Sequence, residues 1–505
     1  MNHSVAMTRT ERTYYVVFGG YTLAQFFIAP VYPLFLLSRG LDLFQMNAVL
    51  ATYLITVFVF EVPTGAIADR FSRKTTFLSS CVIRMGAYGL YARAHGFADC
   101  LVAEFIDAVG TTLASGALDA WVVDGVRADG DTRPTDRLFA RAQVVFRTVM
   151  IVGGVACGYV AELGWAVPWL VCAGMFALTA IAGGLLMHEA RPAADKARRA
   201  RSLGGTALAG VAAVRRAPVL RLLCALALTA AFAGFPLYIL WQPRVQPLVG
   251  GGLWPMGWIL ALINVAGLTG GALVPRLLRR FEREVVLAAA ALWRSTMLVV
   301  AATATGLWPM LAGLLLQEIS LGLSDPVLMA WTNEHVAADY RATVLSVRST
   351  FFTLGGATGL LAMGLVARGM GIPVAWAVSA AVVALMAPGY LALGRVARQV
   401  AVSEVPTEVL GTLPTNGGPS DGRLSLAARA ENPLVSAADP HRQSRITGER
   451  GIGLGSNASP ERAAPAGLLH AGVAAVGAET GLGPPGGWVG AHLPVGETSA
   501  ARNSA

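Results

Sequence analysis

Four acidic residues lie inside long apolar stretches of the sequence, where a charge is energetically unfavourable. Glu104 and Asp107 are three residues apart, and Glu318 and Asp325 are seven apart, so each pair shares one face of a helix. A charged residue at the centre of a membrane helix costs about 2.5–3.5 kcal/mol, which marks these positions as functional candidates. Low-dielectric surroundings favour the protonated form of a carboxyl group, so these acids are candidate proton carriers or substrate contacts.

Two arginines in neighbouring apolar stretches offer a structural alternative. Arg84 lies at about the depth of Asp107, and Arg294 lies at about the depth of Glu318. Each arginine could neutralise the nearby acid as a buried ion pair. The sequence leaves proton coupling and structural pairing open for Asp107 and Glu318.

The chain that holds these residues is dominated by apolar stretches. It has 505 residues, 55% hydrophobic and 14% charged, with a mean hydropathy of +0.57. Average globular chains have about 25% charged residues, and a helical membrane crossing needs about 20 mostly apolar residues. We therefore predict an all-α integral membrane protein with twelve transmembrane helices. They begin near Tyr14, Met46, Thr76, Leu101, Ala142, Ala166, Leu220, Leu253, Val285, Leu307, Val344 and Ile372.

Basic residues are concentrated in alternate loops between these stretches. The net charge of +9 is spread over short clusters in such loops, rather than over one surface that would bind nucleic acid. Basic loops are cytoplasmic by the positive-inside rule, so we expect both termini in the cytoplasm. Lysine occurs only at Lys74 and Lys196 among many arginines. This usage is typical of a GC-rich bacterial gene and indicates a bacterial inner membrane.

Changes in composition divide the chain into four predicted parts. We expect six-helix bundles at residues 1–188 and 219–395, joined by a cytoplasmic central loop at residues 189–218. Residues 396–505 are rich in Gly, Ala, Pro and Ser without a sustained apolar period, and we expect a disordered cytoplasmic tail there.

The two predicted bundles repeat each other in sequence. Arg84 recurs as Arg294, and Ala120-Trp121 recurs as Ala330-Trp331 at the same offset. An ordered series of matches across several helices indicates two parallel six-span repeats. Such repeats place a polar cavity at their interface, as in alternating-access carriers.

A loop motif connects this architecture to a known family. Residues 65–74 read GAIADRFSRK and resemble the loop signature between spans two and three of the major facilitator superfamily, with Ile67 and Ser72 in place of Leu and Gly. The resemblance covers about residues 10–395. It implies a cytoplasmic gating motif formed by Gly65, Asp69, Arg70, Arg73, Lys74 and Asp124.

The resemblance also implies how this motif would act. Asp69 would accept hydrogen bonds from the N-terminus of span eleven near Arg341, and Arg70 or Arg73 would pair with Asp124. Such contacts form in one rocking state and not in the other. The structural alternative is that the positive charge only keeps the loop inside. In the second half Pro275 replaces the acid, so we expect no equivalent latch there.

Two further stretches, residues 60–65 and 115–121, resemble drug- and metabolite-efflux members of the superfamily. The resemblance implies proton-coupled export of a hydrophobic or amphipathic small molecule. Gly154 and Gly158 form a GxxxG pattern that predicts close helix packing, whereas Tyr159 stands where superfamily exporters continue with proline. Proton-coupled uptake of a nutrient or metabolite remains an alternative. A transporter-like sensor or scaffold that does not transport is another.

The remaining sequence features concern enzyme activity, cofactors and binding partners. No H-E-x-x-H motif, no G-x-S-x-G motif and no His or Cys cluster is present, so we expect neither enzyme activity nor a cofactor or metal. We expect a monomer in the lipid bilayer with a small-molecule substrate, protons as the coupling ion and no nucleic acid. Aromatic residues could line the substrate path or face lipid; they are Tyr21, Phe26, Phe27, Tyr32, Trp241 and Trp254.

Overall fold

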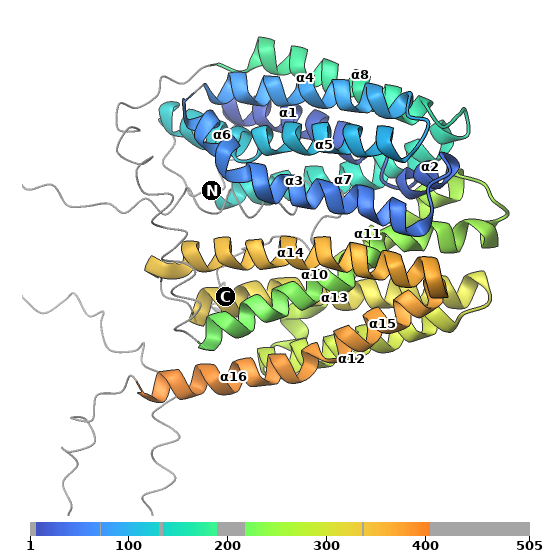
Figure 1. Cartoon of the computed structure of the whole chain (residues 1–505). Coiled ribbons are helices and arrows are strands. Elements are labelled where there is room, and N and C mark those ends of the chain that lie inside the picture. Colours follow the sequence, from blue (N-terminus) through green and yellow to red (C-terminus); the bar gives the residue numbers. More distant parts are fainter. Residues whose placement is uncertain (1–6, 71, 131–134, 189–217, 336–337, 404–505) are drawn as a thin grey trace, which may run out of the picture. The chain divides into compact units, whose positions relative to one another are not determined.

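The computed structural model describes residues 7–70, 72–130, 135–188, 218–335 and 338–403, and these residues form helices without strands (Figure 1). The first half contains α1 (Arg9–Phe26), α2 (Tyr32–Ser38), α3 (Leu43–Arg70), α4 (Arg73–Ala92), α5 (Phe97–Ala114), α6 (Ala117–Ala128), α7 (Asp136–Ala161) and α8 (Val167–Leu186). The second half contains α10 (Pro218–Val245), the 3-10 helix η3 (Gln246–Val249), α11 (Trp254–Leu277), α12 (Arg283–Thr303), α13 (Leu307–His335), α14 (Ala338–Met370), α15 (Ile372–Ala384) and α16 (Met386–Ser403). Of the predicted central loop at residues 189–218, residues 189–217 lie outside the described residues. The prediction of a disordered tail from residue 396 is wrong for residues 396–403, which continue α16, and the rest of the tail lies outside the described residues.

Helices occupy all twelve predicted stretches, and ten segments of the described residues have the length and composition of membrane spans. The two stretches that do not meet this standard are α1 and α4. The apolar run of α1 is interrupted after Phe26, and the chain resumes as the short helix α2. Polar residues and the buried Arg84 lower the hydropathy of α4. Part of the polarity that sets α4 apart, at Thr76, Ser80 and Arg84, is therefore inside the protein.

Span four is broken in the middle by a glycine. Gly116 has a φ of +68°, a left-handed conformation that residues with a Cβ atom rarely adopt, and it separates α5 from α6. The break changes the direction of the helix, and Asp119 at the start of α6 accepts a hydrogen bond of 2.8 Å from the Tyr14 hydroxyl of α1. The turn thus fixes the inner end of span four against span one.

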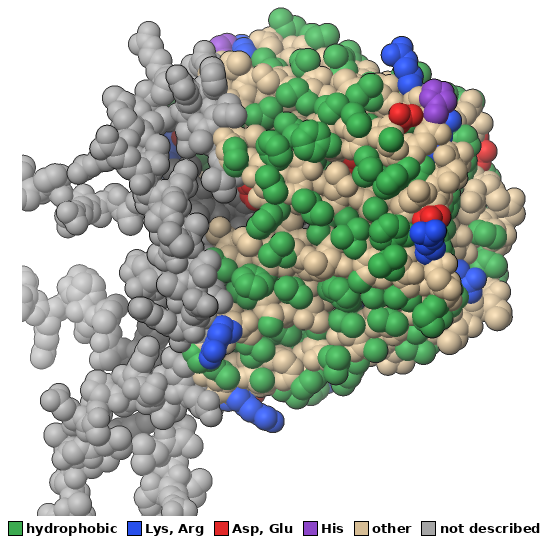
Figure 2. All heavy atoms as spheres, in the orientation of Figure 1, with side chains coloured by type: hydrophobic (Ala, Val, Ile, Leu, Met, Phe, Trp, Pro, Cys, Tyr) green, Lys and Arg blue, Asp and Glu red, His purple; other side chains and the backbone are tan. Residues whose placement is uncertain are grey.

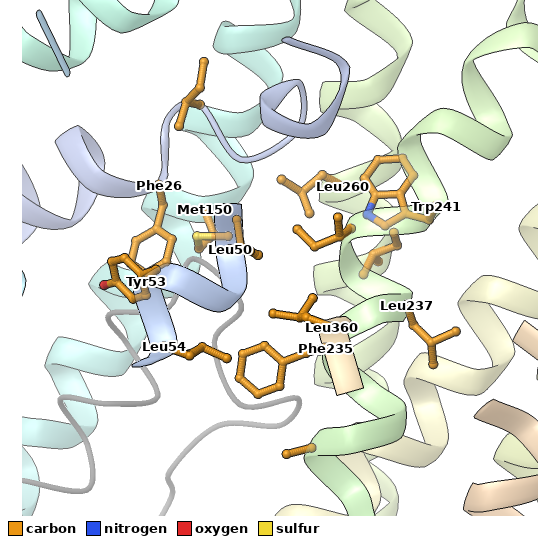
Figure 3. Packing of buried hydrophobic residues seen from close by; sticks show 14 of the residues in the cluster. Phe26, Leu50, Tyr53, Leu54, Met150, Phe235, Leu237, Trp241, Leu260 and Leu360 are labelled. Atoms are coloured by element: carbon orange, nitrogen blue, oxygen red, sulfur yellow. The ribbon is translucent and has the colours of Figure 1, made fainter. Parts of the chain in front are cut away.

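The two halves meet chiefly along two helix pairs, α3 with α14 and α7 with α11, and α2 also contacts α10. Large apolar side chains fill the space between the halves, including Leu54 of α3, Phe235 of α10 and Leu260 of α11 (Figure 3). A Cβ atom at Gly158 of α7 would lie 2.7 Å from the carbonyl oxygen of Trp254, so the backbones touch there. This confirms the close packing predicted from the GxxxG pattern.

The surface of the helices is apolar between two charged ends. On the face in Figure 2, basic side chains lie toward the two ends and hydrophobic side chains cover the region between them. Several large apolar residues are more than half exposed, among them Leu163, Leu185 and Trp308. Exposed apolar surface of this extent is expected where lipid, rather than water, is the solvent.

Candidate functional site

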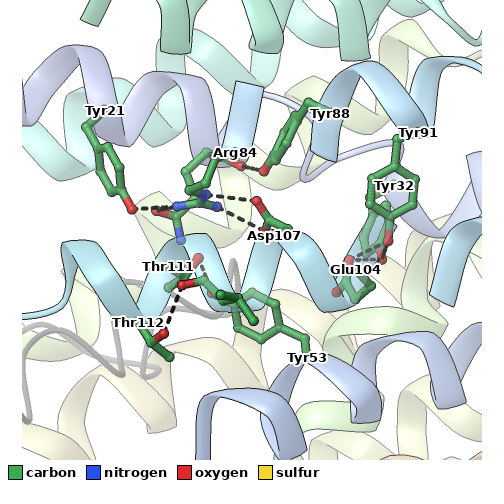
Figure 4. Close-up of polar contacts among 12 residues, drawn as sticks. Tyr21, Tyr32, Tyr53, Arg84, Tyr88, Tyr91, Glu104, Asp107, Thr111 and Thr112 are labelled. Atoms are coloured by element: carbon green, nitrogen blue, oxygen red, sulfur yellow. Dashed lines mark hydrogen bonds and ion pairs between the residues drawn. The ribbon is translucent and has the colours of Figure 1, made fainter. Parts of the chain in front are cut away.

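The first half of the protein holds a buried ion pair at its centre (Figure 4). The Arg84 guanidinium of α4 donates from Nε to Asp107 Oδ1 at 2.8 Å and from Nη2 to Asp107 Oδ2 at 3.1 Å. Arg84 has no exposed surface and Asp107 very little. Two parallel hydrogen bonds of this kind are the strongest arrangement available to a carboxylate and a guanidinium.

Neighbouring side chains use the remaining donors of Arg84. Its Nη1 donates to the Tyr21 hydroxyl at 2.7 Å and to Gln25 Oε1 at 3.0 Å. The guanidinium also lies over the ring of Phe176, with 4.8 Å between Cζ and the ring centroid. Arg84 is therefore held on every side, and moving it would break several contacts at once.

Glu104 lies one helical turn from Asp107, but tyrosines surround it. The hydroxyls of Tyr91 and Tyr32 both donate to Glu104 Oε2, the latter at 3.0 Å (Figure 4). The ring of Tyr91 stacks on Trp169 with centroids 4.1 Å apart. Among the described residues, no arginine or lysine donates to this carboxyl group.

These residues line a cavity between the two halves. Its volume is about 90 Å³, and Glu104, Asp107 and Arg84 are the charged residues on its wall. Tyr32 and Trp241 line it as well, whereas Trp254 is half-exposed outside it. The aromatic candidates from the sequence therefore divide between cavity and surface.

The second half has a hydrogen-bond relay in place of the ion pair. Arg294 Nε donates to Gln317 Oε1 at 3.3 Å, and Gln317 Nε2 donates to Glu318 Oε2 at 2.9 Å. Tyr238 donates to Glu318 Oε1 at 3.1 Å. Gln317 follows Arg294 by 23 residues, as Asp107 follows Arg84. The residue that matches Asp107 is therefore Gln317, and Glu318 is its neighbour.

Several buried polar groups of the second half are only partly satisfied. Asp325 Oδ2, Arg348 Nε and Arg294 Nη2 are buried without a hydrogen-bond partner among the described residues. Arg147, from the first half, donates to Asn264 Oδ1 at 3.3 Å. Asp325 is thus half-buried, with the charges of Arg348 and Arg294 near it, but no hydrogen bond among the described residues joins it to either, unlike Asp107 and Arg84.

The residues of the gating motif lie at the ends of α3, α4 and α6. Arg73 Nη2 lies 3.1 Å from Asp124 Oδ2. Lys74 Nζ donates at 2.7 Å to the carbonyls of Gly184 and Met187, at the C-terminal end of α8. Gly65, Asp69 and Arg70 belong to the last turns of α3. Their side chains, like that of Arg341, lie outside the described residues.

Sequence patterns alone did not identify several residues of the site. Tyr91 and Tyr238 donate to the acids, and Gln317 takes the place of an acid in the relay. The sequence indicates Tyr32 only as a candidate aromatic residue of the substrate path, not as a donor to Glu104. A signal existed for one of them: Arg84, Tyr88 and Tyr91 are spaced four and three apart, which places all three on one face of α4. No group of three or more metal-binding side chains occurs in the part of the chain that the structure describes.

The sequence and the fold are similar to those of known proteins. The family model of the Major Facilitator Superfamily matches residues 15–292 and residues 255–436. An uncharacterized MFS-type transporter, YxaM of Bacillus subtilis strain 168, is 29% identical over 149 residues, which are 30% of this chain and 36% of that protein. The chain therefore aligns with about a third of the length of this relative.

Solved structures show the same fold. The nucleoside transporter NupG has a TM-score of 0.62 at 14% identity over 76% of this chain and 99% of that chain. A D-xylose-proton symporter has a TM-score of 0.57 at 14% identity over 75% and 95%. The family inferred from the loop motif is confirmed by the match of the family model over most of the chain. This chain belongs to the major facilitator superfamily.

Proposed function

We propose that this transporter exports a hydrophobic or amphipathic small molecule in exchange for protons. The observation that carries the proposal is Glu104, a carboxyl group buried at the wall of the central cavity and held by tyrosine hydroxyls. Tyrosine hydroxyls can donate to the carboxylate, and one of them can turn to accept from the protonated acid. Glu104 can therefore gain and lose a proton without breaking an ion pair.

Asp107 is a weaker candidate for the coupling residue than Glu104. Its two oxygens are bound by Arg84, and protonating it would leave a buried guanidinium without its counter-charge. We assign Asp107 and Arg84 a structural role in the first half. Glu318 and Asp325 are the corresponding coupling candidates of the second half, because neither accepts a hydrogen bond from arginine among the described residues.

The proposal includes twelve membrane spans with both termini in the cytoplasm of a bacterial cell. Ten segments of the described residues have the required length and composition. We assign two further spans, one formed by α1 together with α2 and the other by α4. Packing supports the addition, because α4 contacts α5 and α8 along its length, and α1 contacts α7 and α8. The basic ends of α3, α4, α7 and α12 then face the cytoplasm.

We further propose that residues 65–74 act as a cytoplasmic latch. The Arg73–Asp124 pair joins α4 to α6 within the first half, and Lys74 joins α4 to the end of α8. These contacts hold the start of α4 in one position relative to its own bundle. Asp69 would then be the residue that reaches the second half and is released when the bundles rock.

The test uses everted membrane vesicles from an efflux-deficient bacterium that expresses the full chain. An acid-inside proton gradient is followed with a pH-quenched dye while lipophilic cations and antibiotics are added. We expect a compound that dissipates the gradient with the wild type but not with Glu104→Gln. The matched control is Asp119→Asn, a substitution of another membrane-helix acid that accepts from Tyr14 outside the cavity, and it should respond like the wild type.

Each result separates the competing functions. If Glu104→Gln responds like the wild type, proton exchange stands but Glu104 is not the coupling residue. If the wild-type protein is present and no compound dissipates the gradient, export by proton exchange is contradicted. Uptake with protons would instead acidify the interior of right-side-out vesicles when substrate is added. A sensor or scaffold would lose its function on deletion of residues 404–505, whereas transport should survive that deletion.

A further inference from the structure

The wall of the central cavity carries one unbalanced charge. Among its lining residues Arg84 is positive, and Asp107 and Glu104 are negative. Arg84 and Asp107 neutralise each other through two direct hydrogen bonds, so the charge of Glu104 remains when its proton leaves. A ligand that replaces this proton should therefore bring one positive charge.

Glu104 also has an oxygen available to a ligand. Both tyrosine hydroxyls donate to Oε2, and Oε1 has no hydrogen-bond partner among the described residues. The cavity offers a second acceptor in Gln242, which is 3% exposed and whose Oε1 is buried without a partner. The Gln242 Nε2 is the amide atom that faces the Ala29 carbonyl, at 3.4 Å, so the acceptor end of this amide is the free one.

Aromatic rings surround the carboxyl group. Tyr32, Tyr91 and Trp169 form a stacked and edge-to-face cluster beside Glu104, with centroids 4.1–5.9 Å apart. The faces of such rings attract cations, most strongly where water is excluded. The Trp169 indole N–H also lacks a partner, but one neutral donor does not offset a full negative charge. Charge therefore determines the class of ligand.

The size of the cavity limits what can enter it. Its volume of about 90 Å³ is well below the roughly 300–1,000 Å³ of pockets that enclose drug-sized ligands. A small head group fits, and the remainder of a larger molecule would have to lie along the interface between the halves. We propose that the cavity binds the protonated amine head group of the substrate, with an ammonium N–H on Glu104 Oε1. The inference rests on the proposed exchange of substrate for protons and names the substrate class.

The binding mode distinguishes two kinds of cation. A protonated primary, secondary or tertiary amine can donate a charge-assisted hydrogen bond to Glu104, whereas a quaternary ammonium has no N–H and is bulkier. Losing such a hydrogen bond typically weakens binding by about tenfold or more. The cavity should therefore prefer a protonated amine over its trimethylated analogue.

The experiment measures binding of three probes to the purified full chain in lipid nanodiscs by titration calorimetry. The probes are benzylamine, which is protonated at neutral pH, benzyltrimethylammonium and the neutral benzyl alcohol. We expect benzylamine to bind at least tenfold more tightly than either analogue. Glu104→Gln should remove this preference. Gln242→Leu should weaken the binding of benzylamine by a few fold. Gln246→Leu is the matched control outside the cavity and should bind like the wild type.

The inference is overturned if folded wild-type protein fails to bind benzylamine, or binds benzyltrimethylammonium equally well. It is also overturned if Glu104→Gln keeps the full affinity for benzylamine. Thermal unfolding of each variant shows whether it is folded, and Gln242→Leu gives an independent reading if Glu104→Gln is not. If benzylamine binds but neither it nor any panel compound dissipates the gradient faster than in vesicles without the protein, the proposed function fails and the binding site stands. If other compounds dissipate the gradient and benzylamine does not bind, the proposed function stands and the amine-binding site fails.

Discussion

Arg84 and Arg294 occupy matching positions in the two repeats but have different partners. Arg84 is bound by the carboxylate of Asp107, and Arg294 by the amide of Gln317. Removing one member of a buried ion pair typically costs about 3–5 kcal/mol, because a charge is left without compensation. Removing a neutral hydrogen-bond partner typically costs about 1–3 kcal/mol. The same position should therefore be far less tolerant of change in the first half.

Alanine substitutions at the two matching positions test this difference. We expect Asp107→Ala to lower the stability of the protein by about 3–5 kcal/mol and Gln317→Ala by about 1–3 kcal/mol. Thermal unfolding of the full chain in detergent shows which of the two variants loses more stability. The double variant Arg84→Met with Asp107→Leu should recover most of the loss, because no charge remains buried. Equal losses for the two alanine variants would contradict the assignment.

At the scale of helices, local sequence predicts the apolar spans well and their interruptions poorly. Apolar residues predominate in the stretches that begin near Met46 and Val285, although the second contains Arg294, and this predicts both spans. The stretch that begins near Thr76 is also helical, but Arg84 and its tyrosines give α4 a hydropathy below that of a typical span. The break at Gly116 was not predicted, because the sequence shows a glycine without showing its φ angle.

Substitution of Gly116 by alanine tests the role of this break. A left-handed conformation costs an alanine about 1–2 kcal/mol, so Gly116→Ala should lower the unfolding temperature. Gly86, in the interior of α4 with open space around it, is the matched control. Gly86→Ala should leave stability unchanged or raise it by about 0.5–1 kcal/mol. If both variants behaved alike, the left-handed turn would not be the reason for the glycine.

At the scale of the whole transporter, polar contacts join the two halves at one end. Glu162 Oε1, after α7, accepts from the backbone nitrogens of Leu253 and Trp254 at 2.6 and 3.0 Å, at the N-terminus of α11. Arg368 and Asp42 form an exposed ion pair at the same end. In the proposed topology this end faces the outside, so this conformation is closed toward the exterior. The sequence repeats predicted two halves with a cavity between them, but not which end is closed, since the same sequence must form both states.

Glu162→Ala should shift the protein toward opening at this end. A carboxylate at an exposed helix N-terminus contributes about 0.3–1 kcal/mol, so the open population should rise about two- to fivefold. Spin labels can be attached at His95→Cys and Trp308→Cys, two exposed positions near this end. Electron paramagnetic resonance should then measure a longer distance between the two labels in Glu162→Ala than in the protein without that substitution. Arg368→Ala removes an exposed ion pair that contributes little and should leave the distance distribution unchanged. No difference between the two variants would argue against Glu162 as an outer latch.

The relay through Gln317 has a consequence for how this protein can diversify. A mutation in the Arg84–Asp107 pair removes a charge that its partner needs, so the first half can change there only by two coordinated steps. A mutation of Gln317 alters a neutral group, and Arg294 and Glu318 keep each other's charge nearby. Single substitutions can therefore accumulate at Gln317 while the Arg84–Asp107 pair stays constant. New specificities in descendants of this gene are expected to arise by drift around Gln317 and Tyr238.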